Sequence, residues 1–378
     1  MIYLDYAATT PMSEVALCAY NEGSQLYFGN ASSLHDIGMN ARDALQLCRK
    51  QHSLFLNGET EGIYFTSGGT EANILAILSI VQAYKSKGNH LITTKVEHAS
   101  LFHLFQQLEN DGFEVTYLDV NEHGTIQLDI LKQAIRPTTI LASIHHGNGE
   151  IGTVQPLEEI GEILKAHQII FHSDCVQTYG EIKIDVKKCK VDSISVSSHK
   201  IYGPKGVGFC YISPSVLWKS IYDGTTHEDG FRPGTVDVPS IVSFTAAAQQ
   251  MMETMEERAA NYNQLRTLFL QEIKKLSDKI MVEQSLEAQL PQIIGLTCLH
   301  VQGQYMMLEC NRHGICISTG SACQVGMESP SRTMLAIGKS ESEAKCFIRI
   351  SLGSKTTKEE LERTVIVMER IFQSLPSL

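Results

Sequence analysis

GIYFTSGGTEANILAILSIVQAY, residues 62–84, joins a short run of β-branched and aromatic residues to a longer amphipathic run through Gly68 and Gly69. The first run is typical of a strand, and the second of a helix. Glycines let a backbone approach an anion closely, and Thr70 opens the helix whose N-terminus would face that anion. The stretch therefore predicts a strand, a tight turn and a helix, with a phosphate site at the turn. Taken alone, it also fits an ordinary strand–helix turn with Thr70 as the N-cap.

The same strand-then-helix pattern recurs from residue 60 to about 215. Further strand-like runs are HLITTK, FEVTYLD, TILASIHH, QIIFHSD, SISVSS and VGFCYIS. Amphipathic stretches separate most of these runs, which favours a mostly parallel sheet with helices on both faces. The predicted fold class is therefore α/β, with ligands bound at the carboxyl ends of the strands.

The rest of the chain is expected to form a second, smaller unit. A long helical stretch at about 240–276 leads out of the sheet region, and runs such as IIGLTCLHV and CFIRISLG alternate with helices after it. We predict a large α/β domain over residues 13–250. Residues 1–12 and 251–378 are predicted to form a small α+β domain, which carries a cysteine loop at about 318–331.

Composition and charge argue against several classes of protein. The chain has 378 residues, of which 43% are hydrophobic, enough for a substantial core. A formal net charge of -11 disfavours nucleic acid and anionic membranes as partners. No apolar run is long enough to span a bilayer, and the N-terminus MIYLDYAATTP lacks the features of a signal peptide. We therefore expect a cytoplasmic protein.

One of the ten cysteines has unusual neighbours. No two form a C-x-x-C pair, so reduced thiols are expected, and most, such as Cys18, Cys48 and Cys210, are predicted to be small buried residues. Cys323 instead lies in STGSACQVGMESPS, residues 318–331, whose small and polar residues predict an exposed, mobile loop. An exposed thiol in such a loop is either a bystander or a reactive group.

A glycine motif in the middle of the chain suggests a nucleotide site. GNGEIG, residues 147–152, matches G-x-G-x-x-G, and Asp174 follows about twenty residues later. In a dinucleotide fold, however, the helix opens within the glycines, whereas Pro156 is predicted here as the first helical residue. An NAD-dependent enzyme therefore remains only an alternative.

Polar side chains follow several predicted strands. Lys200 follows SVSSH at the end of one strand, where a lysine with a lowered pKa can form a Schiff base. Asp174 ends another strand 26 residues earlier (200 − 174), and His98 follows a third. Each residue alone fits a surface lysine, a helix cap or an ordinary histidine. Together with the turn at Gly69, they suggest a site for pyridoxal 5'-phosphate, in which the aspartate would hold the pyridinium nitrogen protonated.

The order and spacing of ten motifs resemble one enzyme family. The motifs are YLDYAATTP, FGNASSLH, FTSGGTEAN, VEH, NGEIGTVQP, SDCVQTYG, SSHKIYGPKG, FRPGT, STGSAC and IRISLG. Each is weak alone, but from residue 2 to about 365 the set resembles the cysteine desulfurases. These are pyridoxal-phosphate enzymes of the class V aminotransferase superfamily, with the fold type I architecture. The cysteine loop is most similar to the long-loop SGSAC class used in iron–sulfur cluster assembly and tRNA thiolation.

The resemblance implies roles for single residues. Lys200 corresponds to the Schiff-base lysine, Asp174 to the pyridinium partner, and His98 to the histidine that stacks on the ring and moves protons. The other implied cofactor contacts are Gln177, Asn148, Gly69, Thr70, Ser197, His199 and Thr235. Thr235 would reach the phosphate of the other subunit, which implies a homodimer. Arg349 would grip the substrate carboxylate, and Asn30 would lie near the substrate.

The implied reaction converts L-cysteine to L-alanine and leaves a persulfide on Cys323 for an acceptor protein. No metal is expected. One departure stands out, because the family usually has asparagine where this chain has Gly149, so Asn148 or Gln177 would have to replace that contact. Cys175, beside Asp174, is interpreted as a small buried residue. Alternatives are another class V enzyme, such as an aminotransferase or a selenocysteine lyase, and a scaffold protein with a decayed site.

Overall fold

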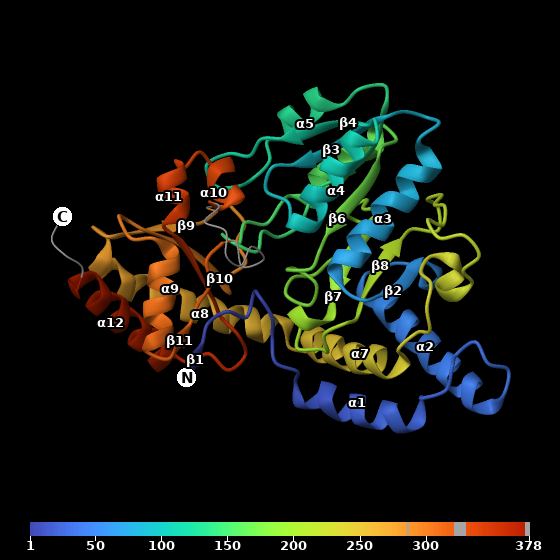
Figure 1. Cartoon of the computed structure of the whole chain (residues 1–378), viewed down its shortest axis with the longest axis horizontal. Coiled ribbons are helices and arrows are strands. Elements are labelled where there is room, and N and C mark those ends of the chain that lie inside the picture. Colours follow the sequence, from blue (N-terminus) through green and yellow to red (C-terminus); the bar gives the residue numbers. More distant parts are fainter. Residues whose placement is uncertain (286, 321–329, 375–378) are drawn as a thin grey trace.

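The computed structural model describes residues 1–285, 287–320 and 330–374. Its larger part is built on a seven-stranded sheet with the order β2-β8-β7-β6-β5-β3-β4 (Figure 1). The strands are β2 (Ile63–Thr66), β3 (His90–Thr94), β4 (Glu114–Leu118), β5 (Thr139–Ser143), β6 (Ile170–Asp174), β7 (Ser193–Ser197) and β8 (Gly208–Ile212). Only β8 runs antiparallel to its neighbours, so the predicted mostly parallel sheet is confirmed.

Helices cover both faces of this sheet, as the alternating pattern predicted. One face packs against α3 (Gly69–Tyr84) and α4 (Ala99–Asn110). The other face packs against α2 (Asp36–Phe55), α5 (Leu128–Ala134), α6 (Leu157–Ala166) and α7 (Val238–Glu253). Helix α1 (Glu14–Leu26) lies on the outside of α7 (Figure 1). The inner strands are therefore buried on both faces, and the carboxyl ends of the six strands that run in the same direction lie at one edge.

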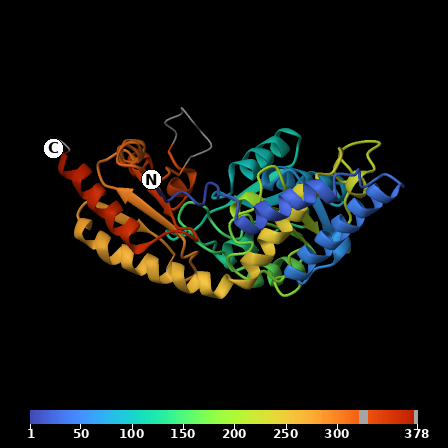
Figure 2. The same ribbon diagram turned by 90° about the horizontal axis from the view of Figure 1, so that it is seen from below.

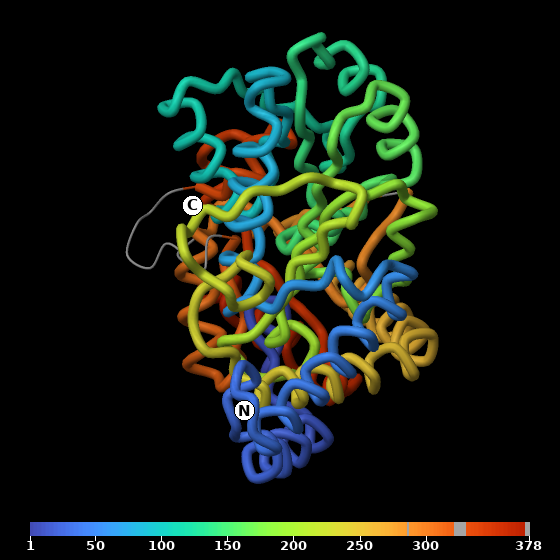
Figure 3. Tube along the Cα trace, turned by 90° about the vertical axis from the view of Figure 1, so that its right-hand side faces the viewer, coloured from blue at the N-terminus to red at the C-terminus, as the bar shows by residue number. Residues whose placement is uncertain are grey.

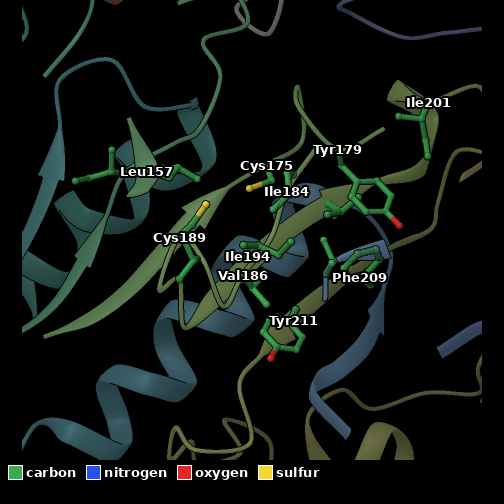
Figure 4. Packing of buried hydrophobic residues seen from close by; sticks show 14 of the residues in the cluster. Leu157, Cys175, Tyr179, Ile184, Val186, Cys189, Ile194, Ile201, Phe209 and Tyr211 are labelled. Atoms are coloured by element: carbon green, nitrogen blue, oxygen red, sulfur yellow. The ribbon is translucent and has the colours of Figure 1, made fainter. Parts of the chain in front are cut away.

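The core on the α2 and α7 face contains Cys175, as Figure 4 shows. This side chain is fully buried among Ile184, Tyr179 and their neighbours, and burial raises the pKa of its thiol. A buried neutral thiol is a poor nucleophile, so the interpretation of Cys175 as a small buried residue is confirmed.

The smaller part has its own antiparallel sheet and its own core. The sheet has the order β12-β10-β9, formed by β9 (Ile280–Glu283), β10 (Ile293–Cys298) and β12 (Phe347–Ser351). The helices around it are α8 (Met255–Ile273), α9 (Gly303–Arg312), α10 (Arg332–Ala336), α11 (Glu341–Lys345) and α12 (Lys358–Ser374). Figure 2 shows the two parts side by side, with α8 running along the smaller one.

The N-terminus belongs to the smaller part. Strand β1 (Ile2–Tyr3) pairs in parallel with β11 (Ile315–Cys316), and Ile2 and Leu4 are buried in the smaller core. Figure 3 shows this dark blue segment next to the red C-terminal region. These contacts support the predicted domain division at residues 1–12, 13–250 and 251–378, which we keep as a proposal.

Two expectations from the sequence are wrong in detail. The helical stretch at about 240–276 is two α-helices, because the backbone leaves helical geometry at Thr254, whose hydroxyl donates to the Gln250 carbonyl (2.8 Å). Cys18 is exposed rather than buried, because α1 packs through its Ala16 and Gly23 side.

None of the described helices is long and apolar enough to cross a membrane.

Candidate active site

The carboxyl ends of β2, β3, β6 and β7 meet at one edge of the large sheet, as predicted. Gly68 and Gly69 follow β2, and His98 follows β3. Asp174 is the last residue of β6, and the short helix η2 (Ser198–Lys200) follows β7 directly. Because β6 and β7 are neighbours, Asp174 and Lys200 belong to adjacent strand ends.

Lys200 is held by the N-terminal segment of the smaller part. Its Nζ donates to the carbonyl oxygens of Ala7 (2.6 Å) and Ala8 (2.9 Å). The amide of Gln177 also donates to the Ala7 carbonyl (3.1 Å). A pocket beside these groups is lined by residues of both parts, among them Tyr6, Gln177, Lys200, Gln292 and Leu352. The two parts of the chain thus meet at the predicted catalytic lysine.

His199 faces the same N-terminal segment. Its Nδ1 lies 3.1 Å from the Thr9 hydroxyl, and its carbonyl accepts from the backbone N–H of Thr10 (2.9 Å). Burial, together with the positive charges of Lys200 and Lys205, lowers the pKa of His199 to about 4. The imidazole is therefore neutral near pH 7 and can serve as a hydrogen-bonding group rather than as a fixed charge.

Asp174 is buried and held from two sides. Only 6% of the residue is exposed. One carboxylate oxygen accepts from the side-chain amide of Asn73 (2.8 Å), and the other from the backbone N–H of Val176 (2.9 Å). A carboxylate fixed in this way is an anchor for a cationic ring nitrogen.

His98 caps the N-terminus of α4. Its Nδ1 accepts from the backbone N–H of Ser100 (3.2 Å) and lies 2.8 Å from the Ser100 hydroxyl. The residue is exposed at the strand edge. The ring is therefore oriented by its own helix while it remains accessible to a ligand.

The glycine turn and β7 form a cradle that fits an anionic group. A Cβ on Gly69 would stand 2.7 Å from the Val176 side chain, so only glycine leaves this approach open. Among the described residues, the buried hydroxyls of Ser197 and Ser198 have no hydrogen-bond partner. Unpaired buried hydroxyls are uncommon and point to a missing ligand or water. Thr70 is exposed in the first turn of α3, where backbone N–H groups attract phosphate.

Arg349 lies on β12 of the smaller part and reaches toward the strand edge of the larger part. Only 6% of the residue is exposed. Its two terminal nitrogens donate to the Gly149 carbonyl and to the carboxylate of Asp5, both at 2.8 Å. Its Nε has no partner among the described residues. The guanidinium therefore retains one buried donor for a further acceptor, such as a carboxylate.

The loop around Gly149 is a turn and not the start of a helix. The side-chain oxygen of Asn148 accepts from the backbone N–H groups of Glu150 (2.8 Å) and Ile151 (3.0 Å), and Gly147 pairs with Val154. Helix α6 begins only at Leu157. The helix that follows GNGEIG therefore begins after its glycines, which argues against the dinucleotide interpretation.

The departure at Gly149 brings Gln177 close. A Cβ on Gly149 would lie 3.0 Å from the Gln177 amide nitrogen. The Asn148 amide donates over 3.4 Å to the Val96 carbonyl and to the Thr333 hydroxyl, so its hydrogen-bonding groups already support the loop. The Gln177 amide, which also donates to the Ala7 carbonyl (3.1 Å), is therefore the side-chain group that lies beside Gly149.

Three of the predicted site residues have no described contact with this cluster. Asn30 is exposed between α1 and α2, where its side chain accepts from the backbone N–H of Ser32 (2.9 Å). Thr235 is exposed between the short helix η3 (His227–Gly230) and α7. Cys323 lies outside the described residues. The described residues contain no cluster of histidine, cysteine and acidic side chains able to hold a metal ion.

Sequence reasoning missed the residues that hold the predicted ones. Asp5 pairs with Arg349, the Ala7 and Ala8 carbonyls hold Lys200, and Asn73 holds Asp174. Asp5 and Asn73 lie inside the quoted motifs YLDYAATTP and FTSGGTEAN, so the motifs marked their importance but not their contacts.

Comparisons with known proteins identify the family of the chain. The family model for class V aminotransferases matches residues 2–364. A putative cysteine desulfurase NifS of Bacillus subtilis strain 168 is 50% identical over 365 residues, which cover 96% of this chain and 92% of that protein.

Solved structures extend the similarity to the whole fold. A NifS-like protein has a TM-score of 0.93 at 29% identity, covering 99% of this chain and 100% of its own. The structure of SspA in complex with cysteine has a TM-score of 0.79 at 32% identity, covering 93% of this chain and 99% of its own. The chain therefore belongs to the class V aminotransferase family and, within it, to the pyridoxal-phosphate-dependent cysteine desulfurases.

Proposed function

We propose that this cysteine desulfurase transfers the sulfur of L-cysteine to Cys323 as a persulfide, releases L-alanine and delivers the sulfur to an acceptor protein. The observation that carries the proposal is the juxtaposition of Lys200 and Asp174 at adjacent strand ends, with Arg349 contacting the Gly149 loop at the same edge. The Ser197 hydroxyl, without a hydrogen-bond partner among the residues that the structure describes, and the open approach at Gly69 fit the phosphate of the cofactor.

Each side chain has a separate task in this proposal. Pyridoxal phosphate, when bound, supplies an electron sink for the bonds at the substrate's α-carbon. Asp174 holds the ring nitrogen protonated, and Gln177 contacts the ring hydroxyl. Lys200 anchors the cofactor and afterwards takes and returns the α-proton at Nζ. His98 is the second group that moves protons at the substrate.

Binding contacts orient the substrate and the cofactor. The guanidinium of Arg349 binds the substrate carboxylate, for which a planar fork is well suited. The phosphate is bound by backbone N–H groups and hydroxyls at Gly69, Thr70, Ser197 and His199. Asn148 supports the adjoining loop, and Asn30 is assigned to the substrate by the family resemblance alone.

The sulfur-transfer step balances without an external oxidant. The thiolate of Cys323 bonds to the substrate sulfur, and the carbon–sulfur bond breaks with its electron pair left on carbon. Protonation of that carbon gives L-alanine. A free cysteine has a pKa of about 8.5, so part of Cys323 is already thiolate near neutral pH.

The exposed surface supports a homodimer. The family resemblance assigns Thr235 to the phosphate of a second subunit, and the ion pair between Arg232 and Glu71 (2.7 Å) holds its segment near the first turn of α3. A group of large apolar side chains is exposed on α1, on α2 and between them: Val15, Leu17, Leu26, Phe28, Leu34, Ile37 and Met39. Large apolar side chains that are exposed in the single chain favour a subunit interface in this region.

The sulfur acceptor is proposed only as a class, a protein that takes sulfur from a persulfide. A persulfide can serve iron–sulfur cluster assembly, tRNA thiolation or another sulfur-trafficking route, and we place the enzyme in the cytoplasm.

The test of the proposed function is mass spectrometry of the holoenzyme after incubation with L-cysteine. The peptide containing Cys323 should gain one sulfur atom, which a reductant removes. An unchanged Cys323 peptide, or a sulfur atom on another cysteine, would overturn the proposal.

A further inference from the structure

A chain of hydrogen bonds links the two polar residues proposed to face the cofactor. Asn73, in the second turn of α3, is 1% exposed and lies behind Asp174. Its amide nitrogen donates to the Asp174 carboxylate (2.8 Å) and to the Ser100 hydroxyl (3.1 Å). The Ser100 hydroxyl in turn lies 2.8 Å from Nδ1 of His98. One buried amide therefore connects Asp174 to His98.

The directions of these bonds follow from the donors available. An asparagine amide has two N–H groups, and here both are used, one toward Asp174 and one toward Ser100. Since the Ser100 oxygen accepts from Asn73, its own proton is left to donate to His98. The backbone N–H of Ser100 points at the same Nδ1 (3.2 Å). Nδ1 thus accepts, and the ring proton of neutral His98 is on Nε2.

The far side of Asn73 fixes the orientation of its amide. Its oxygen lies 3.3 Å from Nε2 of His172, and Nδ1 of His172 lies 3.0 Å from the Ser193 hydroxyl. Burial lowers the pKa of His172 to about 4, so this ring is neutral near pH 7. The Asp174 carboxylate needs the amide nitrogen of Asn73 on its side, so the amide oxygen faces Nε2 of His172 and accepts from it. A flipped amide would place its oxygen against the Asp174 carboxylate and its N–H groups against another donor. Only one orientation of the amide suits all three partners, Asp174, Ser100 and His172.

We propose that Asn73 is a positioning residue that orders the Asp174 carboxylate and, through Ser100, holds His98 in the Nε2–H tautomer. The two residues act on different parts of the reaction, and Asn73 keeps them in a fixed relation. This inference rests on the proposed roles of Asp174 and His98. The placement of the His98 proton can nevertheless be measured without any reaction.

The first test uses the full-length protein without cofactor. Nitrogen-15 NMR of the histidine side chains distinguishes a protonated from an unprotonated ring nitrogen. The proposal expects an unprotonated Nδ1 on neutral His98 in the wild type. It expects a shifted Nδ1 signal in Ser100→Ala, and a signal near that of the wild type in Ser100→Thr, which keeps the hydroxyl. A wild-type proton on Nδ1, or an unchanged signal in Ser100→Ala, would overturn it.

The second test measures the coupling in the holoenzyme. Asn73→Ala should lower kcat for L-cysteine about tenfold or more, with KM changed by less than about threefold, since orientation of proton-transfer groups is lost rather than substrate binding. Asn263→Ala is the matched control, because this exposed asparagine on α8 donates only to the Ala259 carbonyl among its described hydrogen bonds. An Asn73→Ala enzyme with wild-type kcat would contradict the proposal. If Asn73→Ala does not fold, the Ser100 pair supplies the same comparison.

Discussion

At the scale of single residues, the site depends on space as much as on charge. Gly69 is part of the cradle and faces the side chain of Val176, whose backbone N–H donates to Asp174. The Ser197 hydroxyl, which has no hydrogen-bond partner in the described part of the chain, lies behind the same turn, 3.6 Å from the position of a Cβ on Gly68. Crowding at this turn should therefore affect the cofactor before it affects the fold.

Gly69→Ala should weaken the binding of pyridoxal phosphate about tenfold, since overpacking costs about 1–3 kcal/mol. Titration of the protein with the cofactor, followed by its visible absorption, measures this change. Gly112→Ala is the control, because its Cβ would meet nothing within 4 Å, although its φ of 94° makes alanine strained there. Equal cofactor affinity in both variants would contradict the steric account of Gly69.

A buried histidine gives a second prediction at this scale. His52 is fully buried among aromatic rings, and burial lowers its pKa from 6.5 to about 3. Below about pH 6.5, His52 is protonated in the unfolded chain but stays neutral in the folded chain until the pH approaches 3. The contribution of His52 to the unfolding free energy is therefore fully present above pH 6.5 and is lost as the pH falls toward 3. This loss amounts to at most about 1.4 kcal/mol per pH unit.

His52→Gln should therefore flatten the pH dependence of the unfolding free energy between about pH 6.5 and pH 4.5. Urea unfolding at a series of pH values gives the slope for each protein. His103→Gln, at an exposed position on α4, is the control for replacing a histidine by glutamine. A His52→Gln slope equal to that of the wild type would show that His52 is protonated in the folded state.

At the scale of elements, an interior ion pair fixes β2, the strand that leads to the glycine turn. Arg49 of α2 and Glu228 of η3 pair through two contacts of 3.0 Å, and Glu228 also accepts from the backbone N–H of Phe65 (2.7 Å). Both side chains are buried. Glu228 adopts a φ of 45°, a left-handed conformation that is rare for glutamate. The pair thus holds η3 against an edge strand of the sheet.

Glu228→Ala should destabilise the protein by about 3–5 kcal/mol, because it leaves the Arg49 charge buried and unpaired. Asp119→Ala breaks the exposed pair with Lys95 and should cost less than about 1 kcal/mol. Thermal unfolding of both variants, compared with the wild type, measures the difference. Similar small losses in the two variants would mean that Glu228 is not needed to neutralise Arg49.

Local patterns predicted the elements better than their contacts. The strands, the glycine turn and the positions of Lys200 and Asp174 follow from runs of a few residues. The contacts between Asp5 and Arg349 and between Asn73 and Asp174 join residues far apart in sequence, so no local pattern contains them. The break at Thr254 was missed because neither glycine nor proline marks it.

At the scale of the whole molecule, the larger and smaller parts meet at the site. Arg349 comes from the smaller part and Lys200 from the larger, and the N-terminal segment contacts both through Asp5, Ala7 and Ala8. The cluster is therefore complete only when the two parts are docked. The proposed second subunit would add Thr235 to it.

The apolar surface at α1 and α2 should be buried in that dimer. Phe28 and Leu34 are 67% and 86% exposed in the single chain. Replacing both by serine should weaken dimerisation at least about tenfold, since burying each side chain contributes about 1.5–3 kcal/mol. Sedimentation velocity at several protein concentrations measures it, with Ile366→Ser on α12 as control. A wild-type protein that is monomeric at every concentration would refute the dimer.

The most direct test of the account is L-alanine formation from L-cysteine, with a reductant present, by the wild type and by Cys323→Ser. Both proteins should bind pyridoxal phosphate with the same visible absorption, because Cys323 is proposed to act only on the substrate sulfur. The account predicts steady production of L-alanine and sulfide by the wild type and of neither by the variant. Full activity in Cys323→Ser would contradict it, since the sulfur would then leave the substrate without a persulfide on this cysteine.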